Sequence, residues 1–96
     1  MSTIHEPTNV PVPAGATPDG WHSVDHDGVL VRSLEWSRYD AGKISVSIDG
    51  SQRATGEYDK RIAFYGAAEG ETITADQARR FAAALIEAAD ELDKLG

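Results

Sequence analysis

The 96-residue sequence contains no cysteine, so no disulfide bond can constrain its fold. It also lacks an apolar run near the roughly 20 residues that a membrane-spanning helix needs. The N-terminal stretch MSTIHEPTNV has no basic region followed by an apolar one, which is the pattern of a secretory signal. From these absences we expect a cytoplasmic protein that does not enter a membrane, and the missing cysteine fits a reducing compartment.

Basic residues are scarce: nine Lys and Arg stand against sixteen Asp and Glu, for a formal net charge of −7. The acidic excess runs through the whole chain, so it would repel a phosphate backbone. We therefore expect no nucleic-acid partner, whereas a basic protein remains compatible with the charge. The length fits one domain, which buries only roughly 60 to 65% of its unfolded surface, so a covering partner would stabilise it.

Catalytic motifs are missing as well, since there is no cysteine nucleophile, G-x-S-x-G elbow, H-E-x-x-H pair or phosphate-binding loop. The densest polar stretch is WHSVDHDGVL, where Asp27-Gly28 predicts a type I′ hairpin with His26 opposite Val29 and Asp25 opposite Leu30. His22 and His26 would then lie about 13 Å apart along one strand, too far to share a metal ion. We expect no enzyme, cofactor or metal site; the alternative is a His-dependent enzyme or metal protein built on these two histidines.

All four prolines fall within residues 1–20, among small and polar residues. This composition predicts an extended or disordered arm that lies outside the core. Two interpretations stay open: an unstructured leader, or an arm that docks on a partner or a neighbouring subunit. Residues 21–96 are then the single folded domain.

From Trp21 onward, apolar residues alternate with polar ones, which is typical of strands with one wet face. Leu30, Leu34 and Trp36 share one face, and so do Ile44, Val46 and Ile48. The glycine of RYDAGK predicts a hairpin loop of three to five residues, and RIAFYG predicts a third strand with Ile62 and Phe64 inward. Residues 49–60 form either an extra hairpin at Asp49-Gly50 or a mobile loop.

The C-terminal third changes to a helical period and predicts a helix over residues 75–95. Thr74 and Gln77 match a capping box, with Ile73 placed to contact Ala78 as a hydrophobic staple. The predicted fold class is therefore α+β: an antiparallel meander of three or four strands with one long C-terminal helix packed on one face.

This helix, at roughly 31 Å, exceeds the roughly 20 Å of a six-residue strand, and its apolar arc spans roughly 200°. A second apolar contact is implied, and we predict a homo-oligomer formed through the helix; the alternative is that the arm or the 49–60 loop covers the free side. The residues that fit a helix–helix seam are Ala78, Phe81, Leu85, Ala88, Leu92 and Leu95. The acids Asp90, Glu91 and Asp93 oppose the helix dipole, which suggests a basic partner there.

Tyr39 and Tyr58 with Arg61 are further candidates for contact with an unidentified protein, because tyrosine and arginine are enriched at interface centres. The predicted function is a small, acidic, non-enzymatic interaction protein that self-associates. The candidate interaction residues are Tyr39, Tyr58, Arg61, Phe81, Leu85, Ala88, Leu92 and Leu95.

The ending ITADQARRFAAALIEAADELDKL resembles the tails of small uncharacterised actinobacterial and actinophage proteins with strands followed by a helix of the form T-x-x-x-A-R-x-x-A-x-A-L-x-x-A-A-D-E. The residues that match are Thr74, Ala78, Arg79, Ala82, Ala84, Leu85, Ala88, Ala89, Asp90 and Glu91. The resemblance implies no catalytic residue. It implies only a setting, in which the alternative function is a structural part of a phage particle whose arm docks on a neighbour.

Overall fold

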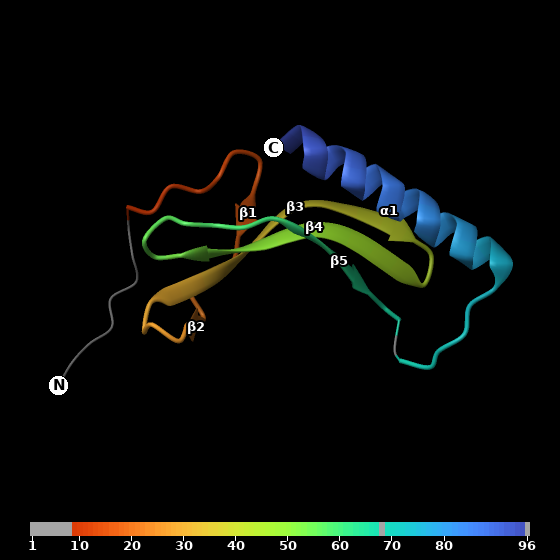
Figure 1. Cartoon of the computed structure of the whole chain (residues 1–96), viewed down its shortest axis with the longest axis horizontal. Coiled ribbons are helices and arrows are strands. Elements are labelled where there is room, and N and C mark those ends of the chain that lie inside the picture. Colours follow the sequence, from red (N-terminus) through yellow and green to blue (C-terminus); the bar gives the residue numbers. More distant parts are fainter. Residues whose placement is uncertain (1–8, 68, 96) are drawn as a thin grey trace.

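The computed structural model describes residues 9–67 and 69–95, which form one antiparallel sheet and one helix (Figure 1). The sheet order is β1-β3-β4-β5, with β2 also paired to β3. The predicted α+β class, with a C-terminal helix on one face of the sheet, is confirmed. The elements are β1 (Thr17–Pro18), β2 (Ser23–Val24), β3 (Leu30–Ala41), β4 (Ile44–Arg53), β5 (Arg61–Tyr65) and α1 (Ala75–Leu95).

The two central strands are longer than predicted, with 12 residues in β3 and 10 in β4. Ala41 pairs with Ile44, so the loop between them has two residues, Gly42 and Lys43, and not three to five. Gly42 has a φ of 71° and Lys43 is not in the positive-φ region, which is the pattern of a type II′ turn. This tight turn lets both strands extend to the end of the hairpin.

A register shift between Glu35 and Ser37 places a bulge at Trp36. The bulge reverses the alternation of β3, so that Leu34 before it and Tyr39 after it face the same side of the sheet. Tyr39 is therefore half-buried against the core and does not lie on the wet face.

Residues 49–60 form an extra hairpin, one of the two predicted alternatives, but its turn lies at residues 53–56 and not at Asp49-Gly50. β4 runs on to Arg53, whose backbone N–H donates to the Glu57 carbonyl at 2.8 Å. The returning chain crosses β4 closely at Gly50, where a Cβ would lie 2.0 Å from the Asp59 carbonyl oxygen. Only glycine fits this crossing.

The first hairpin also differs from the prediction by one residue, because Val24, not Asp25, lies opposite Leu30. Gly28 N–H donates to the Asp25 carbonyl at 3.0 Å, and Asp25 N–H donates to the Val29 carbonyl at 2.9 Å. Gly28 alone has a positive φ, whereas a type I′ turn also needs one at Asp27. The connection is thus a turn followed by a glycine bulge.

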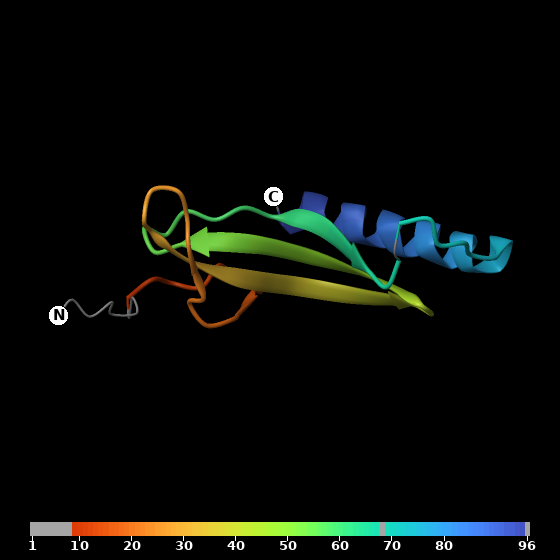
Figure 2. The same cartoon turned by 90° about the horizontal axis from the view of Figure 1, so that it is seen from below.

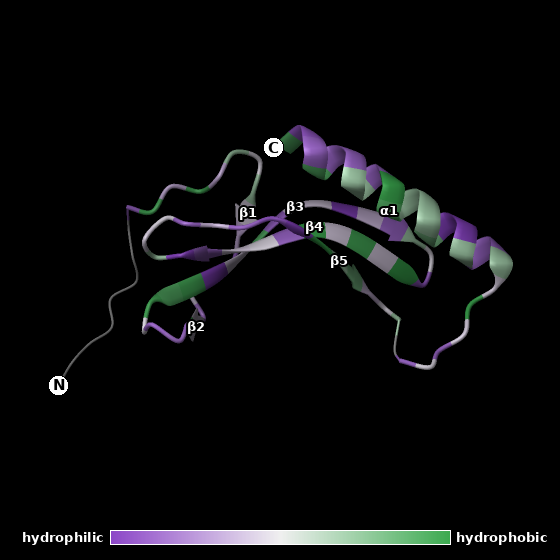
Figure 3. Cartoon of the chain, in the orientation of Figure 1, coloured by the Kyte–Doolittle hydropathy of each residue, from purple (hydrophilic) through white to green (hydrophobic). Residues whose placement is uncertain are grey.

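One face of the sheet has two separate covers (Figure 1). α1 covers the half near the Gly42 turn, where Val46 and Ile48 of β4 pack with Ala84 and Ala88. Apolar residues concentrate along this part of β4 beneath the helix (Figure 3). The other half, which includes Arg32 and Gln52, lies beneath the chain N-terminal to β1.

Residues 9–20 lie against the sheet of their own chain. This part of the arm is docked, as in the second interpretation, but on its own fold and not on another molecule. After residue 16 the chain reaches the outer edge of β3, where Thr17 pairs with Glu35 and Pro18 with Leu34. Figure 2 shows the molecule from below, with the chain around β1 beside β3 at one edge of the sheet and β5 at the opposite edge. The part of the predicted arm before residue 9 lies outside the described residues.

α1 begins and ends where the sequence predicted. Thr74 Oγ1 accepts a hydrogen bond from Gln77 N–H at 3.1 Å, so the predicted N-cap is present. The Gln77 side chain donates to the Ala41 carbonyl, so it ties the first turn to the sheet in place of closing a capping box. No helix in the described part of the chain is both long and apolar enough to cross a membrane.

Candidate interaction surface

The predicted interaction residues divide into buried and accessible groups. Ala88 of α1 is fully buried against the sheet, so it cannot contact another molecule. Tyr39, Leu92 and Leu95 are half-buried against the core of their own chain. The helix seam inferred from their spacing is therefore largely the contact between α1 and its own sheet.

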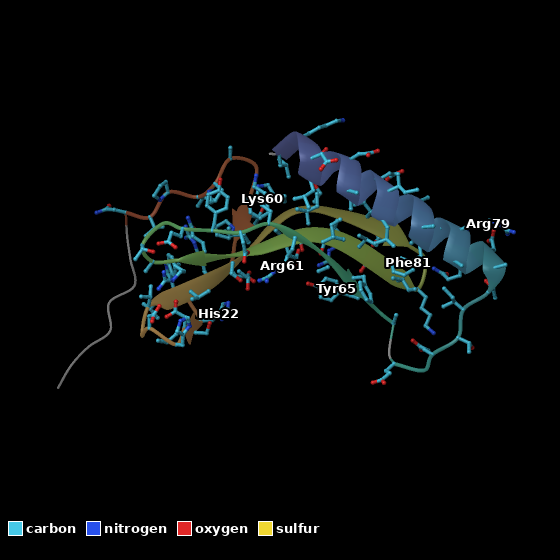
Figure 4. All side chains as sticks on the ribbon, in the orientation of Figure 1. His22, Lys60, Arg61, Tyr65, Arg79 and Phe81 are labelled. Atoms are coloured by element: carbon cyan, nitrogen blue, oxygen red, sulfur yellow. The ribbon has the colours of Figure 1, made fainter. Side chains whose placement is uncertain are left out.

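The exposed candidates are Tyr58 and Arg61, whereas Phe81 and Leu85 are half-buried and also pack against the core. Tyr58 is 48% exposed, with its ring centroid 6.1 Å from that of Trp36. Arg61 projects from β5 and donates to Ser51 Oγ at 3.1 Å. Tyr58 and Arg61 thus lie apart from Phe81, and the structure does not bring all the predicted residues into one patch (Figure 4).

The histidines of the first hairpin lie far from the helix (Figure 4). His22 Nε2 is 3.1 Å from Ser33 Oγ, and His26 is exposed beside Asp27 at 3.4 Å. Among residues 9–67 and 69–95, no group of three or more His, Cys, Asp or Glu side chains could hold a metal ion. Asp25, which the sequence grouped with them, instead pairs with Arg53 at 2.7 Å.

A polar cluster that sequence inspection did not identify lies on the face of the sheet opposite α1. Tyr65 donates a hydrogen bond to Asp49, and Arg38 donates to Glu35 at 2.9 Å while its guanidinium lies 5.5 Å from the Tyr65 ring centroid. These side chains line a shallow depression of about 440 Å³. The bond to Asp49, together with partial burial, raises the pKa of Tyr65. The cluster therefore stabilises a protonated phenol and supplies no activated nucleophile.

Two oxygen atoms beneath this cluster are buried without a geometrically satisfactory hydrogen bond, Ser47 Oγ and Asp49 Oδ1. Ser47 still lies close enough to the Tyr65 hydroxyl to lower its pKa slightly, against the larger effect of Asp49. The cluster packs Tyr65 and Arg38 over the wet face of β4, and we interpret it as a structural cover of that face.

The edge of the sheet at β5 is open. β5 pairs with β4 on one side, and among the strands and the helix of the described residues it contacts only β4 and α1. The opposite edge, at β3, is paired along part of its length by β1 and β2. An unpaired strand without proline presents free backbone donors and acceptors that can pair with another strand. Phe64 at this edge is 56% exposed, although its ring contacts Phe81 of α1 at a centroid distance of 5.7 Å.

The flank of α1 above β5 continues this apolar edge. Phe81 points from the helix toward the sheet (Figure 4), and at about 100° per residue the positions next to it on the same flank carry no charge. The opposite flank, above the Gly42 turn, carries Arg80 and Glu87. We define the β5–α1 surface as the residues that form this uncharged edge and flank, namely Phe64, Ala78, Phe81, Ala82, Leu85 and Ala89.

Part of the β5–α1 surface could be predicted from the sequence. The 200° apolar arc of the helix correctly indicated more apolar surface than one sheet covers, and Ala78, Ala82 and Ala89 are indeed exposed. Phe64 faces the α1 side of the sheet, as predicted, but α1 crosses mainly over β3 and β4 and leaves this side chain largely exposed. Comparison of the chain with protein-family models, with curated proteins and with solved structures found no match.

Proposed function

We propose that the protein is a cytoplasmic, non-enzymatic interaction protein that forms a homodimer through its β5–α1 surface. The single observation that carries the proposal is the open edge of β5 lying beside an uncharged, partly exposed helix flank. Sheet edges in monomeric proteins are usually protected by charge, proline or a covering loop. Ile62–Tyr65 has no charged residue and no proline.

A second copy fits this edge because the strand is self-complementary. If two β5 strands pair antiparallel about a two-fold axis at Ala63, Ile62 lies opposite Phe64 of the partner subunit and Arg61 lies opposite Tyr65 of the partner subunit. Both members of the first pair are apolar, and in a two-fold interface each favourable pair occurs twice. The joined sheet would place both helices on the same face, with their apolar flanks toward each other.

Charge also favours this geometry. A chain with a net charge of −7 repels its own copy in general, so contact must occur where acids are absent or matched. The β5–α1 surface contains no acid, and the Arg61 side chain is 62% exposed. In the paired sheet, Arg61 approaches the ring of the partner's Tyr65. In each subunit the Tyr65 hydroxyl donates a hydrogen bond to the Asp49 carboxylate. The contact thus brings a cation toward an acidic site across the interface.

The test is sedimentation equilibrium of the full chain from about 5 to 500 μM, with two adjacent helix substitutions. Ala82→Glu puts a charge on the β5–α1 surface, whereas Ala83→Glu puts the same charge about 100° away on the opposite side. Both residues are exposed, so both variants should keep the fold. We expect the parent and Ala83→Glu to dimerise alike and Ala82→Glu to dissociate roughly 10- to 100-fold more readily.

A parent chain that stays monomeric throughout this range contradicts the proposal. Equal weakening by both glutamates also contradicts it, because the effect would then come from general charge repulsion. Phe64→Arg adds a test of the strand edge, and here a dimer of unchanged stability would exclude β5 from the interface.

A further inference from the structure

Residues 10–16 rest on β3 and β4 over the other half of the same sheet face. We define the arm groove by the three side chains that hold this segment, namely Arg32, Trp36 and Gln52. Trp36 rises from the β3 bulge between the area beneath α1 and the groove. The arm groove shares no residue with the β5–α1 surface.

All three side chains donate hydrogen bonds to backbone carbonyls of the arm. Arg32 Nη2 donates to the Val10 carbonyl at 3.2 Å, and Gln52 Nε2 donates to the Pro11 carbonyl at 3.0 Å. The Trp36 indole N–H donates to the Ala14 carbonyl at 3.1 Å. The groove therefore recognises the backbone of the arm, because none of these hydrogen bonds depends on the identity of the arm's side chains.

The donors are built into the fold and do not reach the arm by chance from the surface. Gln52 is only 1% exposed and Arg32 only 9%. The Gln52 side-chain oxygen accepts two bonds from the Arg32 guanidinium, at 2.9 and 2.7 Å, and the guanidinium lies 4.5 Å from the centroid of the Trp21 ring. This network fixes both donors toward the arm through contacts in which the arm takes no part.

The groove suits a segment that accepts hydrogen bonds and donates none. Among the described residues, no backbone N–H of residues 10–14 donates to the sheet, and Pro11 and Pro13 have no N–H to donate. Proline also restricts the backbone before binding, which lowers the ordering cost. Arg32, Trp36 and Gln52 bind the arm only as donors, so a segment with few N–H groups matches them.

The arm makes fewer apolar contacts than the strands and helix of the core. Pro11, Val12, Ala14 and Gly15 are exposed, and Val12 retains 41% of its accessible surface. Only three residues of the segment are half-buried: Val10, Pro13 and Ala16. A tethered segment with so few apolar contacts can leave its groove without opening the core beneath α1.

We propose that the arm groove is a binding site for a proline-containing peptide that turns as residues 13–16 do, and that residues 9–19 occupy it as a tethered ligand. A peptide of the same chemistry supplied in trans competes for the three donors. Because the tether keeps the arm at a high effective concentration, the intact chain excludes a free peptide until the arm is released. The site and its ligand class are independent of whether the protein dimerises through β5.

The experiment uses the full chain with a protease recognition sequence inserted between Asp19 and Gly20. Gly20 is exposed and has no neighbouring atom within 4 Å of its ideal Cβ position, so the insertion should be tolerated. The folded chain is cleaved, the arm fragment is removed by dilution and gel filtration, and a fluorescent peptide of residues 9–19 is titrated in. We expect saturable binding to the cleaved chain and at least roughly tenfold weaker binding to the uncleaved chain.

Matched variants test the mode of recognition. In cleaved Trp36→Phe the ring remains but the indole donor is lost, so we expect the peptide to bind roughly three- to tenfold more weakly. Tyr39→Phe also removes a polar group from an aromatic side chain, but Tyr39 packs against the core beneath α1 and is none of the three donors, so binding should match the parent. A peptide with Pro11 and Pro13 both changed to alanine should bind more weakly than the parent peptide.

Three results would overturn the proposal. The first is a cleaved chain that stays folded by circular dichroism and does not bind the peptide at 1 mM. The second is a chain that unfolds when the arm is removed, because the arm is then an inseparable part of the core. The third is equal binding of a peptide with the same residues in scrambled order, which would show adhesion without recognition.

Discussion

Asp25 shows how one carboxylate organises the first hairpin. Its Oδ1 atom accepts bonds from the backbone N–H groups of Asp27 at 2.8 Å and Val29 at 3.1 Å. Its Oδ2 atom pairs with Arg53 of β4. The bond from Val29 N–H is the main cause that lowers the pKa of Asp25, and the Arg53 side chain adds to it. The aspartate is thus a structural link between a turn and the sheet, in a stretch where the sequence suggested chemistry.

We predict that Asp25→Asn removes a pH-dependent part of the stability. Because the folded-state pKa is lowered, the ionised carboxylate stabilises the fold above the unfolded pKa of about 3.8. This contribution is lost as the pH falls through the folded value. Urea unfolding from pH 2.5 to 7 should show the variant less stable than the parent at neutral pH, with the difference shrinking below about pH 4.

Asp27→Asn is the control, since Asp27 is 59% exposed, lies 3.3 Å from Arg53 and accepts no described backbone bond. Its effect should be smaller at neutral pH. A difference between Asp25→Asn and the parent that stays constant down to pH 2.5 would argue against the carboxylate as the source of the stabilisation.

Some residue-level features were predictable from local sequence and others required the fold. Thr74 as an N-cap was predictable, because capping depends on neighbours three residues away. Gln77 fitted the same local pattern, but it bonds to Ala41, which only the packing of α1 on the hairpin brings near. The carbonyl contacts of Arg32 and Gln52 were likewise invisible, since they join residues more than twenty positions apart.

The C-terminal end of α1 is stabilised from outside the helix. Lys60, just before β5, donates to the Leu95 carbonyl at 2.5 Å, and its ammonium lies 5.8 Å from the Trp36 ring centroid and 5.9 Å from that of Tyr58. A cation at this end interacts favourably with the helix dipole. Lys60 therefore offsets part of the unfavourable effect of Asp90, Glu91 and Asp93. The basic group that we sought in a partner is supplied, at least once, by the chain itself.

We predict that Lys60→Met destabilises the protein by about 1 kcal/mol through loss of this cap. Methionine keeps the apolar stem that packs beside the aromatic rings. Lys94→Met removes the same charge from the exposed last turn and leaves the Lys60 bond intact, so its effect should be smaller. Urea unfolding measures both, and hydrogen exchange of residues 92–95 should rise more in Lys60→Met. Equal effects of the two variants would show that only net charge matters.

At the level of elements, the periodicity of apolar residues predicted the helix more accurately than the strands. The 75–95 helix was predicted to its end residues because cap, apolar period and terminus agree locally. The strand lengths were underestimated, since residues 49–53 are mostly polar yet continue β4 beneath the arm. The bulge at Trp36 had no signal in the sequence, and it moved Tyr39 from an expected contact surface into the core.

For the whole molecule, the main difference from expectation is that one sheet face has two covers. The sequence indicated a helix with more apolar surface than one sheet covers, and an arm with too few apolar residues to fold alone. In either case the missing contact could have come from another molecule. The fold places α1 and residues 10–16 side by side along β4, with Trp36 between them. The same three-four spacing of apolar residues serves a sheet or a partner helix, so spacing alone could not assign the β5–α1 surface.

Because the two covers differ in burial, we predict that they open independently. Ala16 N–H bonds to the Pro13 carbonyl and Asp19 N–H to the Ser33 carbonyl, both in a largely exposed segment. Their amides should exchange by local opening at roughly 1 to 3 kcal/mol, with little dependence on urea. The amides of Val46 and Ile48, which are 0% exposed, should exchange only at the global unfolding free energy of roughly 5 kcal/mol or more.

Native-state hydrogen exchange with increasing urea measures this difference, and Phe81→Ala sharpens it. That substitution weakens the contact between α1 and the sheet, so it should lower the protection of Val46 and Ile48 by roughly 2 to 4 kcal/mol. The protection of Ala16 and Asp19 should change far less, since their opening does not require the helix to leave. If all four amides lose protection together, the arm and the helix form one cooperative unit, and a releasable arm is excluded.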